Sequence, residues 1–489
     1  MNSLDPDLVA VRAGLEGYPE DPPFHPHETW PESPFGEVSP VPNPVYRGVR
    51  DAFRLLGLDA EAQGTPEWNP LGAVVHPGDL VVLKPNLVRH WNGAEDHITA
   101  LVTHGSVVRA VLDYVLIALR GEGEIIVGDA PVQEADFDSV CRQNGLAETV
   151  AWCAERAGGV RVSLIDWRRE RAHTLETGTI LETEALPGDP RGFVEVDLGR
   201  DSFLTPLEDA ADRFRVTNYD RGAMREVHTR ERNCYLISGS VLRADVVITL
   251  PKMKCHGKAG VTCCLKNNVG INGHKDWLPH HREGSREEGG DEYEHKSLRK
   301  RLLTALTDRA DRVSALSVKK ALYYAGQALR RTARIVPCKD PYLEGSWYGN
   351  DTVWRMCLDL NRILFFVDAE GRLRDTPQRR YFGLIDGVVA GEADGPLHPR
   401  SKRAGVLVAG SHPAAMDLVC CRLMGFDDRK VPLIRGAFDQ ESRPVLHPGG
   451  PENVRVVSNH APFERLFELA RSETLAFEPH RGWKGHVEL

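Results

Sequence analysis

Short apolar runs recur along this chain of 489 residues, each a few residues long and bounded by turn or helix signals. The first two are Asp79–Leu83 and Glu124–Val127. An amphipathic stretch, Ser106–Arg120, lies between them and ends at Gly121-Glu122-Gly123. Continuous apolar runs of this length are typical of strands buried on both faces, and a helix between two of them makes the repeating unit of a parallel sheet. The pattern predicts an α/β fold.

Later parts of the chain repeat the pattern. Helical segments, of which Val45–Leu56 is the first, alternate with the apolar runs. This alternation favours a mostly parallel sheet with helices on both faces. The further strands are predicted at Val162–Ile165, Asp245–Leu250, Phe382–Ile385 and Gly405–Ala409.

The predicted organisation is one α/β domain between two terminal segments. Nine prolines lie between Pro19 and Pro44 and disfavour regular structure, so we expect an extended, Pro-rich N-terminal arm. Two stretches interrupt the alternation of strands and helices and are interpreted as insertions. The predicted boundaries are 1–45 for the arm, 46–460 for the domain, about 168–235 and about 274–345 for the insertions, and 461–489 for a C-terminal helix and tail.

Composition narrows the function classes. The chain has 61 Lys and Arg against 70 Asp and Glu, a net charge of -9, so we expect no nucleic-acid partner. Residues 1–14 resemble no export signal, and no run of about 18 apolar residues occurs, which favours a cytoplasmic protein. None of the ten cysteines has C-x-x-C spacing, so we expect reduced thiols and no iron-sulfur cluster.

Polar side chains follow the predicted strands where each strand ends. Lys84 and Asn86 follow the first strand, and Asp129 follows the second. Asp386 directly follows the run Phe382–Ile385. Because the carboxyl ends of parallel strands meet at one edge of a sheet, where α/β folds bind ligands, we expect these residues to form one composite site.

A cationic group follows the strand Asp245–Leu250. Lys252, Lys254, His256 and Lys258 lie within seven residues. Cations gathered in this way need an anion among them, so the predicted substrate is a small molecule bearing phosphate or carboxylate. The alternative is a solvated lysine loop. The predicted substrate-binding residues are Lys84, Asn86, Lys254, Lys266, Asn267 and Asn268.

Lys252, His256 and Asp386 are the predicted catalytic residues. Neighbouring cations should lower the pKa of His256 and so suit it to proton transfer. Asp129, Asp386 and Asp417 are the predicted metal ligands, because gathered carboxylates suit a hard cation such as Mg²⁺ or Mn²⁺. The alternative for these aspartates is a structural role in capping loops or in the helix predicted to begin at Pro413.

Six motifs occur in order along the chain: L-K-P-N at 83–86, V-G-D-A-P at 127–131, L-P-K-M-K-C-H-G at 250–257, L-K-N-N-V-G at 265–270, D-G-V-V-A-G-E-A-D-G-P at 386–396 and A-M-D-L-V-C-C-R-L-M-G-F-D at 415–427. Together they resemble the domain of unknown function 362 family of bacteria and archaea. The resemblance covers about residues 80–427 and implies a shared site of lysines, asparagines and aspartates. Many members carry a ferredoxin-like module with two iron-sulfur clusters, whose cysteine pattern is absent here, so an electron-transfer role does not carry over.

The leading hypothesis is an enzyme that acts on an anionic small molecule, with transfer, hydrolysis and isomerisation all open. The alternatives are a non-catalytic anion-binding or membrane-peripheral assembly protein, and a redox protein that lacks its ferredoxin module. Residues 296–334 hold eleven Lys and Arg against two Asp and could contact an anionic membrane surface, or could form a solvated helix pair packed on the core. The single-site hypothesis fails if Lys252 and Asp386 lie more than about 15 Å apart.

Overall fold

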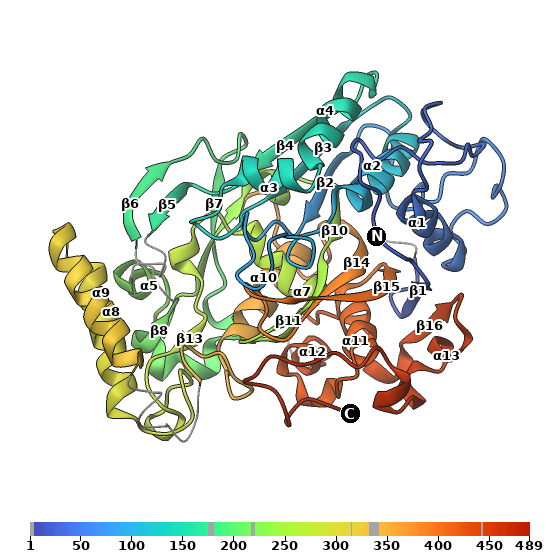
Figure 1. Cartoon of the computed structure of the whole chain (residues 1–489). Coiled ribbons are helices and arrows are strands. Elements are labelled where there is room, and N and C mark those ends of the chain that lie inside the picture. Colours follow the sequence, from blue (N-terminus) through green and yellow to red (C-terminus); the bar gives the residue numbers. More distant parts are fainter. Residues whose placement is uncertain (1–3, 175–179, 217–220, 314, 332–341, 442–443) are drawn as a thin grey trace.

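The computed structural model describes residues 4–174, 180–216, 221–313, 315–331, 342–441 and 444–489. A ten-stranded sheet runs through the centre of the molecule (Figure 1). Its main path follows the order β16 (Arg455–Ser458), β1 (Leu8–Ala13), β15 (Arg400–Gly410), β14 (Arg380–Glu392), β10 (Val246–Leu250), β2 (Leu80–Pro85), β3 (Glu124–Asp129) and β4 (Arg161–Asp166), and β11 (Lys252–His256) and β12 (Gly260–Thr262) extend it beside β14.

The sheet is mostly parallel, as predicted. Strands β14, β10, β2, β3 and β4 are parallel neighbours. Strand β15 runs antiparallel to both β14 and β1, and β12 runs antiparallel to β11. Only residues 393–399 join β14 to β15. A parallel return needs a crossover of a dozen or more residues, so this short connection requires the antiparallel pairing.

Helices cover both faces of the sheet, which confirms the predicted fold class. Val81 and Leu83 of β2 pack on one side, and Val82 packs on the other. This alternation follows from the two-residue period of a strand. The first side is covered by α1 (Pro44–Leu55), α2 (Gly105–Leu119), α3 (Phe137–Gln143) and α4 (Leu146–Arg156), and the second by α10 (Val353–Phe366), α11 (Pro413–Leu423) and α12 (Pro432–Ala437).

The N-terminal segment contributes a strand to the main sheet. Within the predicted arm, residues 1–45, Leu8–Ala13 pairs with β15 and β16 and so belongs to the main sheet. Val9, Ala10 and Val11 are fully buried, and this apolar burial explains why the segment enters the sheet. Residues 14–43 contain no helix or strand.

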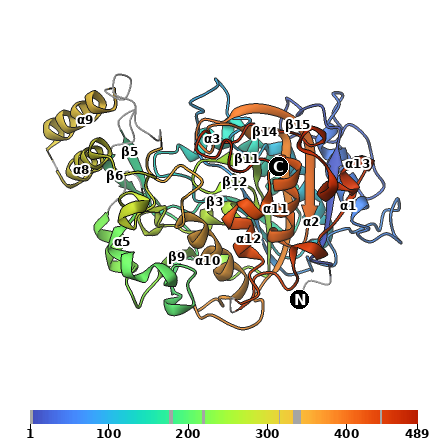
Figure 2. The same cartoon turned by 90° about the horizontal axis from the view of Figure 1, so that it is seen from below.

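The two stretches interpreted as insertions form small elements outside the main sheet (Figures 1 and 2). The first contains the antiparallel pairs of β5 (Glu170–Thr174) with β6 (Ile180–Ala185) and of β7 (Phe193–Asp197) with β9 (Cys234–Ser238). The second contains α8 (Leu298–Arg312) and α9 (Leu316–Arg331). Residues 175–179, 217–220, 314 and 332–341 of these stretches lie outside the described residues.

The C-terminal segment 461–489 begins with one short helix, α13 (Ala461–Glu464), and continues as single turns and extended chain. None of the described helices combines the length and the apolar character that a bilayer-spanning segment requires.

Candidate functional site

A cavity of about 560 Å³ lies where the carboxyl ends of β2 and β3 meet β11. This is the edge at which the sequence pattern predicts a ligand site. Apolar residues, among them Val88, Val132 and Leu278, also line the cavity. Six of the predicted site residues line the cavity, namely Asn86, Asp129, Lys254, His256, Lys266 and Asn267.

A chain of hydrogen bonds holds the polar floor of the cavity. The Lys84 ammonium donates to Asp129 Oδ1 at 2.7 Å and to Asn267 Oδ1 at 3.2 Å. Asn86 Nδ2 also donates to Asn267 Oδ1, at 3.1 Å, and Asn86 Oδ1 accepts from the Lys254 ammonium at 3.0 Å. Lys84 is fully buried and does not line the cavity, so its role is to position Asp129 and Asn267.

One glycine lets the chain pass over this network. A Cβ atom at Gly270 would lie 2.0 Å from Asp129 Oδ1 and 2.6 Å from Lys84 Nζ, well inside van der Waals contact. The Gly270 carbonyl accepts a hydrogen bond from Ala130 N at 2.9 Å. The close approach of the segment after Asn267 to β3 therefore requires glycine at this position.

Four lysines face the cavity, and burial lowers the pKa of each: Lys254, Lys258, Lys266 and Lys275. The pKa of Lys258 falls to about 8 and that of Lys275 to about 7, chiefly because burial disfavours the ammonium form. The Lys266 charge adds to the lowering at Lys254, Lys258 and Lys275. Lys266 is thus the centre of a group of mutually repelling cations.

Two cavity histidines carry their proton on different ring nitrogens. His256 Nδ1 accepts hydrogen bonds from the backbone N–H groups of Lys258 and Ala259, both at 3.1 Å, so the neutral ring carries its proton on Nε2. His280 Nδ1 lies 2.7 Å from the Leu278 carbonyl, which only accepts, so the neutral ring leaves Nε2 without a proton. His256 can donate to a bound ligand, and His280 can accept from one.

Both rings remain neutral at ordinary pH. Burial, and after it the Lys266 charge, holds the pKa of His256 well below its usual value. The same two causes act on His280. The predicted direction of the His256 shift is confirmed, although burial contributes more to it than the neighbouring cations do.

Lys252 and Asp386, two of the predicted catalytic residues, form an ion pair in the protein core. The Lys252 ammonium lies 2.7 Å from Asp386 Oδ2, and both side chains are fully buried. The distance between Lys252 and Asp386 is thus within the limit of about 15 Å that the single-site hypothesis requires. Neither residue lines the cavity, and Tyr18, whose hydroxyl accepts from Lys252 at 2.9 Å, covers the pair. Their location indicates a structural role for both residues.

A register irregularity in β11 explains why Lys252 does not reach the cavity although Lys254 and His256 do. Lys252, Lys254 and His256 alternate along β11 and should point to one side of a regular strand. Lys252 pairs with Asp386 of β14, but Lys254 pairs with Gly391, so two residues of β11 span five residues of β14. The strand is not regular between Lys252 and Lys254, and only the residues after the irregularity reach the cavity.

The three aspartates predicted as metal ligands do not form a common site. Asp129 binds Lys84, Asp386 binds Lys252, and Asp417 accepts from the backbone N–H groups of Cys264 and Leu265 at 2.7 and 2.9 Å. Asp417 therefore anchors the short helix α7 (Cys264–Asn267), and burial raises its pKa to about 7. Asn268, predicted to bind substrate, instead donates to Asn361 of α10 at 2.8 Å and does not line the cavity.

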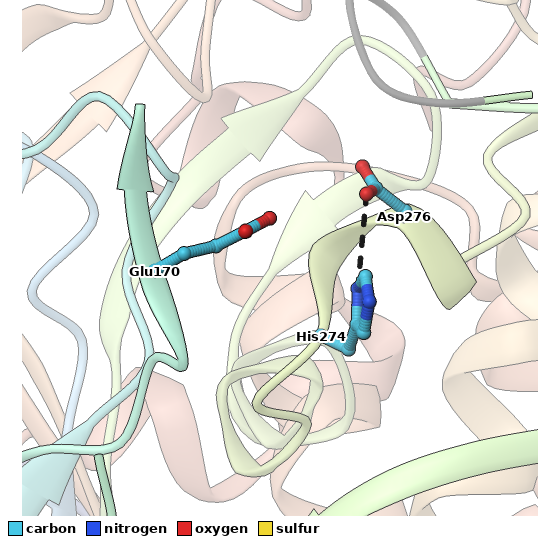
Figure 3. Close-up of side chains that lie close together, drawn as sticks. All are labelled: Glu170, His274 and Asp276. Atoms are coloured by element: carbon cyan, nitrogen blue, oxygen red, sulfur yellow. Dashed lines mark ion pairs between the residues drawn. The ribbon is translucent and has the colours of Figure 1, made fainter. Parts of the chain in front are cut away.

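A different group has the geometry to hold a divalent cation. Figure 3 shows Glu170 of β5 extending toward His274 and Asp276. One potential ligand atom from each of these three residues lies within 4.8 Å of the others. His274 and Asp276 flank Lys275 in the sequence, and Lys275 lines the cavity. Two carboxylates and one imidazole form a ligand set compatible with Mn²⁺ or Mg²⁺.

Several polar cavity residues were not among the predicted site residues, including Lys275, His280 and His480. Lys275 and His280 lie in the polar part of the second insertion, and no strand end or motif singles them out. His480 lies in the C-terminal tail, 224 residues after His256. A Cβ atom at Gly257 would lie 2.9 Å from His480 Nε2, so the tail packs directly on the strand end. Contacts between such distant segments leave no local sequence signal.

Comparison with known proteins gives a family but no activity. The family model described as "Domain of unknown function (DUF362)" matches residues 81–197 and 204–422, more than half of the chain. No curated protein is significantly similar. Among solved structures, the crystal structure of a protein from Thermotoga maritima is similar at 12% sequence identity and a TM-score of 0.32. The similarity covers 77% of this chain and 58% of that protein.

Proposed function

This chain belongs to the domain of unknown function 362 family, and we propose that it is an enzyme that acts on an anionic small molecule in the lysine-lined cavity. The anionic group is a phosphate or a carboxylate. Transfer, hydrolysis and isomerisation of such a molecule all fit the residues present.

The observation that carries the proposal is the group of cations around Lys266. Among the described residues, none forms a hydrogen bond or an ion pair with the Lys266 ammonium. Lys254 donates only to neutral oxygens, those of Asn86 and Leu101. Asp129 attracts these cations without forming an ion pair with Lys254 or Lys266. Burying cations that lack a directly paired carboxylate costs free energy, and a bound polyanion would offset that cost. Binding of an anion would therefore explain why these lysines lie together in the cavity.

The cavity also holds groups suited to proton transfer. His280 offers an unprotonated Nε2, His256 offers an Nε2–H, and the Lys275 pKa of about 7 allows its amine to gain or lose a proton near neutrality. We assign the proton acceptor to His280 and the donor to His256. The group Glu170, His274 and Asp276 is the proposed cation site if the reaction depends on Mg²⁺ or Mn²⁺.

A thermal-shift screen tests binding. Inorganic pyrophosphate, citrate and sugar phosphates, each with and without Mg²⁺ or Mn²⁺, should raise the unfolding temperature of the protein. A ligand at about 100 times its Kd stabilises the native state by about 2.7 kcal/mol. Lys266→Met should abolish the shift. Lys430→Met should keep it, because Lys430 is a surface residue that pairs with Asp427. Equal shifts in both variants would contradict the proposal.

Turnover separates an enzyme from a non-catalytic anion-binding protein. Any stabilising ligand is incubated with the protein and the products are analysed by mass spectrometry. His280→Gln should retain the thermal shift but lose turnover, because glutamine fills similar space and cannot act as a base. Binding without product in the unaltered protein would favour the non-catalytic alternative.

A further inference from the structure

Two helices project from the edge of the molecule, beside the pair of β5 and β6 (Figures 1 and 2). We call residues 298–331, which comprise α8 and α9, the basic hairpin; residue 314 lies outside the described residues. Helix α8 is anchored by the buried side chains of Leu303 and Ala310 and by Thr304, which donates to Glu292 at 2.8 Å. One face of α8 therefore packs against the rest of the protein.

Helix α9 has no buried residue along its 16 positions. Its contacts with the rest of the protein include the Lys319 ammonium, which donates to the Ile180 carbonyl at 2.8 Å, and an ion pair of Arg330 with Glu344 at 3.2 Å. A helix of this length is marginal in water without tertiary packing. Its outer face is therefore open to a partner that would cover it.

The outer surface of the basic hairpin is apolar at several positions. Leu298 is 84% exposed and Tyr324 is 67% exposed. Ten large apolar or aromatic side chains are exposed in the part of the chain that the structure describes, and five of them lie in the basic hairpin: Leu298, Leu302, Leu316, Val318 and Tyr324. Ala321, Ala325 and Ala328 are exposed on the same helix as Tyr324. Such a concentration marks an interaction surface.

The same segment is strongly basic. Residues 298–331 hold nine Lys and Arg against two Asp, an excess of seven positive charges in a chain whose net charge is -9. Arg301, Arg309, Lys320 and Arg331 are exposed. Exposed apolar and exposed cationic side chains thus occur on the same two helices, which is the composition of helices that lie in the plane of a membrane interface.

We propose that the basic hairpin docks onto the surface of an anionic lipid bilayer, with Leu298, Leu302 and Tyr324 entering the interface. Charge and apolar exposure together favour an anionic bilayer over a second copy of the chain or a nucleic acid. A second copy would bring the same positive charge against itself, and a polyanion such as a nucleic acid would leave the leucines in water. A bilayer of anionic lipids complements both features at once, since its headgroups bind the cations and its acyl region receives the apolar side chains.

The docking surface adjoins the cavity. Arg330, in the last turn of α9, lines the cavity together with Tyr342 and Glu344. One wall of the cavity is therefore continuous with the membrane-facing hairpin. The docking proposal does not depend on what the cavity binds, because its contacts lie on the outer surface of α8 and α9.

Vesicle co-sedimentation of the full chain tests the proposal. Vesicles of phosphatidylcholine with about 30% phosphatidylglycerol should sediment the protein at about 50 mM salt and release it at about 500 mM salt, where charges are screened. Vesicles of phosphatidylcholine alone should not sediment it. The variant Leu298→Ser/Leu302→Ser/Tyr324→Ser should bind anionic vesicles at least about tenfold more weakly, and so should Lys320→Glu/Arg331→Glu.

The control variant is Phe467→Ser/Arg465→Glu. Phe467 and Arg465 are also exposed, lie in the C-terminal segment and should leave vesicle binding unchanged. Circular dichroism confirms that each variant is folded. Failure of the unaltered protein to bind anionic vesicles at low salt would overturn the proposal, and so would equal binding by hairpin and control variants. A dimer in light scattering that dissociates with Tyr324→Ser would assign the surface to a second copy and also overturn it.

Discussion

At the scale of single residues, the cavity is organised around one charge. The pKa of Lys84, Lys254, His256 and Lys275 is lowered first by burial, and the Lys266 ammonium lowers each of them further. Lys84 is compensated by Asp129, whose carboxylate raises its pKa again. Among the described residues, Lys254, Lys266 and Lys275 form no ion pair with a carboxylate, so their protonation depends on what the cavity contains.

The first prediction concerns this dependence on pH. Lys275 titrates at about 7 in the folded protein and at its ordinary value of 10.5 when unfolded. Between these values the unfolded state binds more protons, so this residue makes stability rise with pH from about 7 upward. Anion binding favours the ammonium form, so stabilisation by pyrophosphate should instead be greatest below about pH 7 and decline above it. Unfolding temperatures with and without pyrophosphate, at about pH 6 and about pH 9, measure both trends.

A variant checks the assignment of these trends. Lys275→Met should flatten the rise in stability of the free protein and make it more stable near pH 6, because no buried charge then forms. Lys484→Met, which removes a surface lysine paired with Glu478, should leave the profile unchanged. The same profile in Lys275→Met and in the unaltered protein would show that Lys275 is not the titrating group.

The second prediction concerns the ion pair of Lys252 and Asp386. Asp386→Asn leaves the Lys252 ammonium buried without its counter-charge, and breaking a buried pair in this way costs about 3–5 kcal/mol. Urea unfolding measures the loss. The affinity of the folded variant for pyrophosphate, by calorimetry, should change little, because neither residue lines the cavity. A large loss of affinity in a stable variant would show that the ion pair contributes to ligand binding.

Glu155→Gln is the matched control. Glu155 is largely exposed and pairs with Arg156 at 3.1 Å. Exposed pairs contribute at most about 1 kcal/mol, so this variant should unfold almost as the unaltered protein does.

At the scale of elements, the sequence predicts where strands end better than how they pair. The positions of Lys84 and Asp129 followed from apolar runs and from the rule that parallel strands place their carboxyl ends together. The irregular pairing of β11 with β14 was not predictable, because Lys252, Lys254 and His256 read as a regular alternation. Register irregularities depend on the neighbouring strand, which a local pattern does not contain.

The third prediction concerns the contact between β5 and the turn η4 (Lys275–Trp277). Glu170 lies in β5, His274 directly precedes η4, and Asp276 lies within η4. Electron paramagnetic resonance should detect one bound Mn²⁺ per chain, and His274→Ala should abolish it, since two carboxylates alone make a weaker site. His173→Ala changes a half-buried histidine on β5, the strand that carries Glu170, and should leave Mn²⁺ binding intact. Equal Mn²⁺ binding by both variants would exclude a site at His274.

At the scale of the whole molecule, both termini belong to the central architecture. Strand β1 lies between β15 and β16, and the C-terminal tail reaches the cavity through His480 and Arg481. Neither placement could be predicted from the sequence. The run of six residues in β1 precedes a proline-rich segment that reads as an arm, and the tail has no periodic pattern. Both are positioned by contacts with residues more than 200 positions away.

Trp483 fastens the tail to the site. Its indole is 1% exposed, and Nε1 donates to the Gly257 carbonyl at 2.7 Å, directly after His256 of β11. Arg481 Nε, two residues earlier, donates to Asp394 Oδ1 at 2.9 Å, and both of these residues line the cavity. The tail therefore forms one side of the cavity, and the buried Trp483 side chain holds it there.

The last prediction compares two buried tryptophans. Trp483→Ala and Trp68→Ala should each cost about 3–5 kcal/mol of stability, because each leaves a large void. Trp68 packs on the opposite side of the sheet, with α1 and α2. At a temperature where both variants are folded, Trp483→Ala should bind pyrophosphate about tenfold more weakly, a loss of about 1.4 kcal/mol, because His480 and Arg481 lose their support. Trp68→Ala should retain the affinity. Equal affinity in both variants would mean that the tail covers the cavity without contributing to binding, and a parallel loss in both would mean that affinity follows global stability.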